Sequence, residues 1–245
     1  MSLAAEIQRQ RLPDAFTCEA GQFTLAAWLE PASTVGGDAF DYVLDGDRLF
    51  LSMTDAMGHD VDAAMPATLT VGSLRNSRRA DQDLAEMAAT AGRAIAEHRS
   101  GLGFVTGLLL DVRLDEGTVR VVNAGHPLPL LLRGGRVQPV ELQPNLPLGV
   151  LPETEYAVQE FALEPGDRRM QERNAHDVDL EGLLVRNADV HPRQLMQILT
   201  SAVQEAVEHG PRSTSLADDA TALCLQWHGS GGTRRSAAGA SSTPR

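Results

Sequence analysis

The sequence predicts an α+β fold in which packed, mostly antiparallel sheets are flanked by pairs of helices. Strand-like segments in the middle of the chain follow one another as hairpins, with turn signals at 115–117 and 133–135. Helical patterns are grouped in two places, one after the early strands and one near the end. Strands and helices do not alternate one by one, so a doubly wound parallel sheet is not expected.

The period of the apolar residues gives each element in turn. Alternating or β-branched runs predict strands over 23–29, 48–53, 104–112, 118–123, 128–132, 136–142, 156–163 and 220–227. Helical spacing predicts helices beginning at Asp60 and over 83–98 and 192–209. The first of these helices is expected to bury a face made of Val61, Ala64, Met65, Thr68, Leu69 and Gly72. The polar residues that follow 164–167 are assigned to no element.

Composition restricts the class of protein. The 245 residues are 42% hydrophobic and 22% charged, which is typical of a globular protein of one large domain or two small ones. The net charge of −12 disfavours nucleic-acid binding, because an acidic surface repels phosphate backbones. No apolar run approaches the roughly 20 residues of a membrane span, and no signal peptide is evident. A cytoplasmic protein without membrane contact is therefore expected.

The ends of the chain differ from its middle. Residues 1–12 are expected to be the end of a linker-like helix that stops at Pro13, and this helix could pair in a homodimer. Residues 13–228 are expected to form the globular domain. Residues 229–245 are rich in Gly, Ser, Ala and Thr and are expected to be disordered. The two cysteines, Cys18 and Cys224, are expected to be reduced thiols without a functional role.

Four short motifs carry the chemistry: 35–38, 54–58, 123–127 and 218–221. Three of them place an aspartate at a chain bend, and hard divalent cations prefer such carboxylate oxygens. If these bends coincide, the repulsion between the carboxylates would be relieved by two Mg²⁺ or Mn²⁺ ions. Such ions lower the pKa of a bound water, which can then attack phosphorus.

Each motif taken alone also has an ordinary structural interpretation. Gly36-Gly37-Asp38 is a common turn, Asp55 is a common turn or cap residue, and Asp218-Asp219 fits a loop before a strand. His126 could act as a base, but a turn histidine hydrogen-bonded to backbone is the more frequent case. The order and surroundings of the motifs are more specific than any one of them.

Together, segments 35–42, 54–59, 123–133, 146–150 and 218–221 resemble the bacterial PP2C-type (PPM) phosphatases, most closely the SpoIIE/RsbU branch of serine phosphatases. The resemblance covers about residues 5–228. It implies a four-layer αββα sandwich whose two central sheets carry a two-metal cluster at one edge. It also implies hydrolysis of phosphoserine or phosphothreonine by metal-activated water, without a phospho-enzyme.

The resemblance assigns roles motif by motif. It implies that Asp38 and Asp55 are catalytic and ligate both metals, that the Ala56 carbonyl lies beside them, and that Asp218 binds the second metal. The positions that it implies to be structural or to support the ligands are Gly37, Asp41, Gly58 and Asp219. The implied cofactors are two Mn²⁺ or Mg²⁺ ions. The implied substrate is a phosphorylated regulatory protein of the anti-sigma-factor-antagonist type, in stress or sporulation signalling.

Two departures from the family pattern stand out. The family usually has a glycine after the histidine of its Asp-x-x-Gly-His motif, and this chain has Asp60 there. After Arg168 the family continues with an apolar strand ending in Thr-Asp-Gly or Ser-Asp-Gly, whose aspartate binds a metal. Here Arg169 is followed by residues 170–175, which look like those just beyond that motif. The pattern predicts the loss of a central strand and of one ligand, and nothing in the spacing makes Asp177 or Asp179 a substitute.

This gap leaves alternatives open. It could result from a true internal deletion or from a defective or engineered chain. It could also result if one segment of the chain were left out of the written sequence. The alternative function is a catalytically impaired phosphatase-like module that binds a regulatory protein without turnover. A metal-dependent phosphodiesterase is a remoter alternative, because the acidic charge disfavours polynucleotides.

Overall fold

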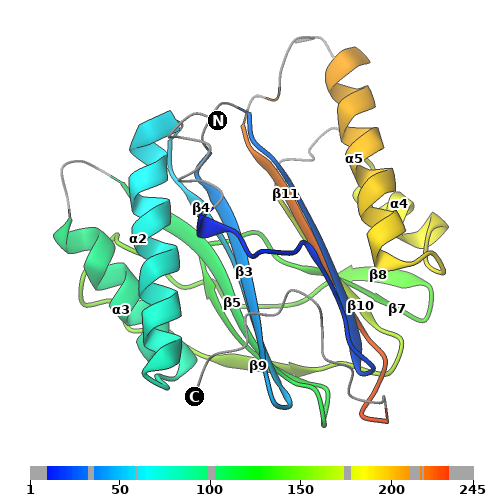
Figure 1. Ribbon diagram of the computed structural model, residues 1–245, viewed down its shortest axis with the longest axis horizontal. Helices are drawn as coiled ribbons and strands as arrows, with labels where there is room; N and C mark the ends of the chain where they lie inside the picture. Colours follow the sequence, from blue (N-terminus) through cyan, green and yellow to red (C-terminus); the bar gives the residue numbers. More distant parts are fainter. Residues whose placement is uncertain are drawn as a thin grey trace.

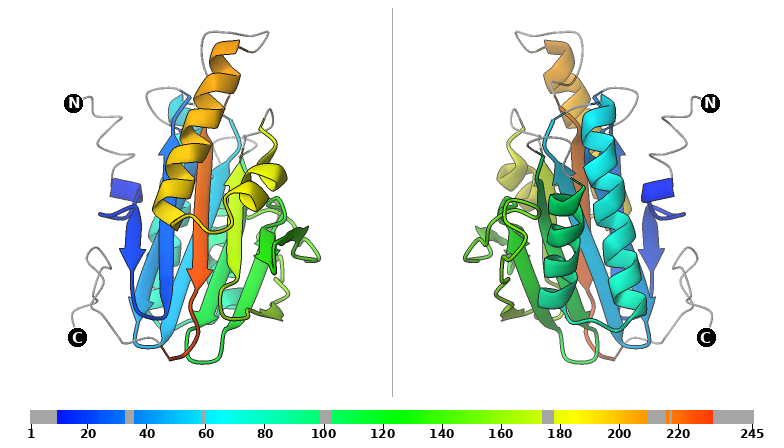
Figure 2. Two further views of the ribbon diagram at one scale, coloured as in Figure 1. Left: turned by 90° about the vertical axis from the view of Figure 1, so that its right-hand side faces the viewer. Right: turned by 90° about the vertical axis from the view of Figure 1, so that its left-hand side faces the viewer.

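Two antiparallel sheets pack face to face, and a pair of helices covers the outer side of each (Figures 1 and 2). The computed structural model describes residues 10–32, 36–58, 60–98, 103–173, 178–209, 216 and 218–231. This four-layer α-β-β-α arrangement confirms the predicted fold class. Most of the expected N-terminal helix (1–9) and of the expected disordered tail (232–245) lies outside the described residues.

Each sheet is continuous and every strand pairing is antiparallel. The six-stranded sheet has the order β1 (Thr17–Glu19), β2 (Phe23–Glu30), β11 (Ala220–Trp227), β10 (Arg168–Arg173), β7 (Leu130–Arg133), β8 (Arg136–Pro139). The five-stranded sheet has the order β3 (Asp38–Asp45), β4 (Arg48–Ala56), β5 (Val105–Arg113), β6 (Thr118–Ala124), β9 (Gln159–Ala162).

The helices divide between the two outer faces, as the two panels of Figure 2 show. Those on the five-stranded sheet are α2 (Asp60–Arg79) and α3 (Leu84–Glu97), and those on the six-stranded sheet are α4 (Leu180–Arg186) and α5 (Pro192–His209). α3 begins with a capping box between Asp83 and Glu86, which satisfies two backbone N–H groups at its start. None of the helices in the described part of the chain combines the length and the apolarity that a membrane crossing requires.

The buried face of α2 agrees with the prediction at Ala64 but not at Met65. Met65 is 52% exposed, whereas the alanines at 63 and 67 are fully buried. Small residues face the sheet because the helix lies close to it: a Cβ added to Gly37 would lie 3.2 Å from the Cβ of Ala63. The hydrophobic period located the helix, but Met65 does not mark the side on which it packs.

The main core lies between the sheets. Inward residues alternate along each strand, so that Phe40, Tyr42, Leu51, Leu108 and Leu225 belong to one buried cluster. The residues between them face the helix layers and form separate clusters with α2 and α3 or with α4 and α5. Cys18 and Cys224 are buried free thiols, as expected, and burial raises the pKa of Cys224 to about 12.

The prediction that a central strand is lost after Arg169 is wrong. The polar stretch Arg168–Arg173 forms β10, which pairs with β11 on one side and β7 on the other. A strand ladder needs only backbone N–H and C=O groups, so a polar sequence can fill the position. The consequence appears in the side chains: Arg169, opposite Leu225 and Leu131 of the inter-sheet core, is only 1% exposed.

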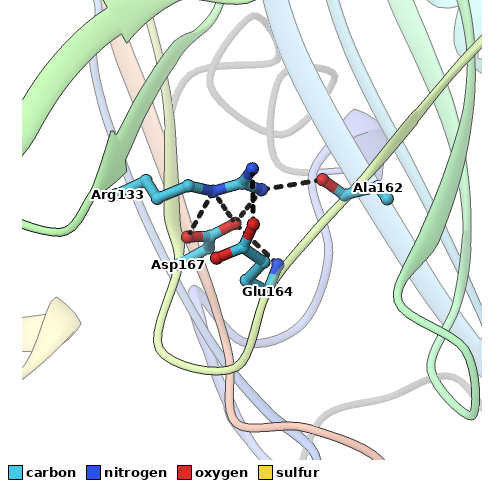
Figure 3. Close-up of polar contacts among 4 residues, drawn as sticks. All are labelled: Arg133, Ala162, Glu164 and Asp167. Carbon is cyan, nitrogen blue, oxygen red and sulfur yellow. Dashed lines mark hydrogen bonds and ion pairs between the residues drawn. The ribbon is translucent and has the colours of Figure 1, made fainter.

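A cluster of charged and polar groups joins the two sheets at the end of β7 (Figure 3). Arg133 donates to both carboxylate oxygens of Asp167, just before β10, and to the carbonyl of Ala162 in the other sheet at 2.8 Å. Asp167 is 3% exposed and also accepts from the amide of Glu164 at 2.7 Å. These charge-assisted hydrogen bonds link the two sheets at this end, with Asp167 buried and Arg133 partly exposed.

Candidate active site

Strand pairing brings Asp38 and Asp55 together. Asp38 begins β3, Asp55 lies near the end of β4, and the two residues stand directly opposite each other. Opposed residues of an antiparallel pair point to the same face. Here it is the face of Phe40 and Met53, so both carboxylates lie where the space between the sheets ends. Their side chains are almost fully buried, with exposures of 2% and 8% for the whole residues.

Two glycines let the chain come close at this point. A Cβ on Gly36 would lie 1.7 Å from an Asp219 carboxylate oxygen, and a Cβ on Gly37 would lie 2.5 Å from the Ala56 carbonyl oxygen. Neither position can therefore hold a side chain without displacing its neighbours. The Ala56 amide also donates to the Gly37 carbonyl at 3.3 Å. The glycine pair thus sets the Ala56 carbonyl beside the two aspartates.

The loop before β11 supports Asp38. Asp219, 4% exposed, accepts hydrogen bonds from the amides of Ala32 at 2.9 Å and of Asp38 at 3.2 Å. Thr221 Oγ1 donates to Asp38 Oδ2 at 2.5 Å. The Asp38 carboxylate is therefore fixed from the opposite sheet. Asp219 holds backbone groups, which agrees with a structural role.

The neighbouring Asp218 has a different environment. It is exposed, and its Oδ1 accepts from the amide of Asp219 at 2.9 Å. Asp218 is therefore at the surface, one residue along the chain from Asp219, which supports Asp38. Gly58, two residues after Ala56, has a positive φ of 103°, a backbone conformation that favours glycine.

Asp41 does not join the site. Its carboxylate receives two hydrogen bonds from Arg75 of α2, at 2.8 and 3.3 Å, and fastens the helix to β3. Asp179 caps α4 by accepting from the Gly182 amide, so it lies outside the site as well. Asp177 lies outside the described residues.

His126 is buried at the same end of the five-stranded sheet. Its Nδ1 shares a hydrogen bond of 2.9 Å with Thr106 Oγ1, and Thr106 stands opposite Asp55 on β5. Its backbone amide donates to Asn123 Oδ1 at 2.7 Å, which holds the turn. The histidine is a turn residue, as expected, and its Nδ1 bonds a hydroxyl group.

The donors present suit a hard divalent cation. Two carboxylates and a backbone carbonyl are the oxygen ligands that Mg²⁺ and Mn²⁺ accept, and Mg²⁺ is commonly held by only one or two carboxylates. Within the described ranges, however, no three His, Cys, Asp or Glu residues are grouped closely enough to form a complete site. The site end of β10 carries Arg173, paired in register with Thr221, and not an aspartate. The described residues therefore fit one ion better than two.

One residue near the site was not indicated by the sequence. Arg11 donates to the Gly36 carbonyl at 2.9 Å and is 2% exposed. An arginine in an amphipathic linker segment gives no signal that its side chain will be buried.

Comparisons with known proteins agree on a family. The sequence profile of the family described as Stage II sporulation protein E (SpoIIE) matches residues 45–228. Comparison with the sequences of curated proteins finds no match.

Among solved structures, the RsbU and RsbW domains of Rv1364c from Mycobacterium tuberculosis match with a TM-score of 0.70 at 23% identity, over 89% of this chain and 62% of that one. The phosphatase domain and regulatory fragment of SpoIIE from Bacillus subtilis match with a TM-score of 0.65 at 18% identity, over 86% and 63%. RsbX in complex with magnesium gives 0.66 at 16% identity, over 86% and 99%. This chain thus spans less than two thirds of the first two structures, and at these identities the likeness shows the fold.

The family match covers most of the chain, including the motifs at 54–58, 123–127 and 218–221. The solved relatives share the two-sheet architecture that places Asp38 opposite Asp55. The chain therefore belongs to the family described as Stage II sporulation protein E (SpoIIE), and its fold is that of the matched PP2C-type phosphatase domain.

Proposed function

We propose that this chain is a metal-dependent protein phosphatase that hydrolyses phosphoserine or phosphothreonine on a regulatory protein. The observation that carries the proposal is the buried Asp38–Asp55 pair at the end of the inter-sheet core. Like charges directly opposite each other are unfavourable without a counter-ion. The proposed ligands are Asp38, Asp55, the Ala56 carbonyl and Asp218.

Some residues of the site would bind the cation, and others hold those ligands in place. Bound Mn²⁺ or Mg²⁺ would supply a Lewis acid and an activated water for attack on phosphorus. Asp38 and Asp55 hold the cation, and Thr221 and Asp219 fix the orientation and backbone of Asp38. The glycines at 36 and 37 let the Ala56 carbonyl approach. This support keeps the ligands in place before the cation arrives.

The proposed substrate is a phosphorylated protein of the anti-sigma-factor-antagonist type. The net charge of −12 speaks against a polynucleotide substrate. The matched structures include the RsbU and RsbW domains of Rv1364c and the cell-fate determinant SpoIIE. By analogy with them, we place this chain in stress or sporulation signalling.

The test is phosphate release from a phosphoserine protein with and without Mn²⁺. The Asp55→Asn variant removes one charge at nearly constant shape. We expect it to lose at least about a hundredfold in rate, because metal ions supply several kcal/mol of transition-state stabilisation. Asp45→Asn is the matched control, since Asp45 is exposed at the far end of β3, the strand that pairs with that of Asp55. Equal rates for Asp55→Asn and the unaltered protein would contradict the proposal.

A second candidate is a binding module that recognises the phosphorylated regulator without turnover. The observation that favours it is the absence of three grouped ligands among the described residues, with a polar strand β10 in place of the family's aspartate-bearing one. The discriminating measurement is binding of the phosphorylated regulator together with phosphate release at saturating Mn²⁺. Binding without release would establish this candidate and exclude the phosphatase.

A further inference from the structure

Arg11 places a buried positive charge beside the carboxylates of the site. It lies in a helical turn with Gln10, and its side chain runs into the protein so that the residue is only 2% exposed. Its Nη2 donates to the carbonyl of Gly36 at 2.9 Å. Gly36 immediately precedes the glycine and aspartate of the site, so the guanidinium reaches the loop that carries Asp38.

The rest of the guanidinium has few hydrogen bonds. Nε and Nη1 are buried and have no hydrogen-bond partner within the described residues. Burial lowers the pKa of Arg11, and attraction by Asp219 and then by Asp38 opposes that effect. Arginine keeps its charge under such conditions, so its burial must be compensated by nearby anions. Among the described residues, the carboxylates whose attraction acts on Arg11 are those of Asp219 and Asp38.

A second arginine anchors the backbone of this segment. Arg75 of α2 donates to the carbonyls of Gln10 at 2.9 Å and of Arg11 at 3.1 Å, while it also holds Asp41. The clamp fixes where the Arg11 side chain enters the protein. The N-terminal segment is therefore tied to the site at two points, through its backbone and through its charge.

We propose that Arg11 is a positioning residue that serves as a built-in counter-cation for Asp38 and Asp219 and thereby lowers the affinity of the site for divalent cations. This inference rests on the proposed function. In the metal-free protein the positive charge of the Arg11 guanidinium compensates the negative charge of the buried carboxylates. A divalent cation that binds at Asp38 is repelled by this guanidinium. The occupancy of the site then depends on where the N-terminal segment holds Arg11.

The test is direct titration of the full chain with Mn²⁺, read by electron paramagnetic resonance of the free ion. We expect Arg11→Met to bind Mn²⁺ roughly tenfold more tightly, because one unit charge near a buried site is removed. Arg11→Lys keeps the charge and should bind within about twofold of the unaltered protein. Arg93→Met removes the same charge from an exposed position of α3 and is the matched control. Arg11→Gln is measured alongside as a second neutral variant, so that the test does not depend on the folding of the methionine variant.

A second readout is thermal unfolding in excess chelator. We expect the neutral variants to unfold at lower temperature than Arg11→Lys without metal, and the difference to shrink with Mn²⁺. Equal or weaker Mn²⁺ binding by both neutral variants would overturn the counter-cation role and leave Arg11 as a brace for the Gly36 loop. Absence of Mn²⁺ binding in every variant would overturn both this inference and the proposed function.

Discussion

At the scale of single residues, the site depends on the absence of two side chains. Gly37 lies against the backbone carbonyl of Ala56, which is itself a proposed ligand. A backbone atom cannot rotate away as a side chain can, so a methyl group there must displace the end of β4. The sequence motif 35–38 indicated a close approach, but only the fold shows which atom is approached.

We therefore expect Gly37→Ala to lower the free energy of unfolding by about 1–3 kcal/mol and to weaken Mn²⁺ binding by about tenfold or more. Urea unfolding and a Mn²⁺ titration measure the two effects. Gly72→Ala is the control: Gly72 is exposed on α2, with open space around its Cβ position, and alanine there should stabilise by about 0.5–1 kcal/mol. If Gly37→Ala matched the unaltered protein in both measurements, the close approach would have no bearing on the site.

At the scale of elements, β10 is the strand whose residues suit their place in the fold least well. It occupies a central position between β11 and β7, yet it sends Arg169 into the apolar space between the sheets. The Nε of Arg169 has no hydrogen-bond partner within the described residues, and its Nη2 reaches only Gln171 at 3.3 Å. Burial lowers the pKa of Arg169 to about 9, which records how unfavourable its charge is there.

We expect Arg169→Met to raise the free energy of unfolding by about 1–3 kcal/mol at pH 7, because the variant buries an unbranched apolar chain in place of a poorly paired charge. Urea unfolding measures the gain. The folded-state pKa lies below the unfolded one, so the stability of the unaltered protein rises with pH above about 9 and the advantage of the variant shrinks there. Arg136→Met, on the exposed strand β8, is the control. A loss of stability in Arg169→Met would show that the guanidinium is well compensated.

The elements that sequence reasoning located are those with a strong apolar period. Helices α3 and α5 lie where helical spacing predicted them, and Leu84, Ile95, Leu195 and Leu199 on them are all buried. β10 was not predicted because its residues are polar. It forms a strand because it pairs with β11 and β7. β3 was not predicted because Asp38 resembled a turn residue, although it is the first residue of the strand. Tertiary context decided both cases.

At the scale of the whole molecule, the site exists because the two sheets end together. β3 and β4 bring Asp38 and Asp55 from one sheet, and β11 brings Thr221 and Asp219 from the other. At the end of β7, Arg133 and Asp167 tie the same sheets together. The order of the motifs predicted that these aspartates would meet. It could not predict the support from Thr221 or the charge of Arg11, since neither follows from a local pattern.

The most direct measurement is anomalous diffraction from crystals of the full chain soaked in Mn²⁺. The account predicts a manganese peak between the carboxylates of Asp38 and Asp55, within bonding distance of the Ala56 carbonyl oxygen. In Asp55→Asn crystals treated in the same way the peak should weaken or vanish. Crystals of the unaltered protein with no manganese between Asp38 and Asp55 would contradict the claim that this pair of aspartates is a metal site.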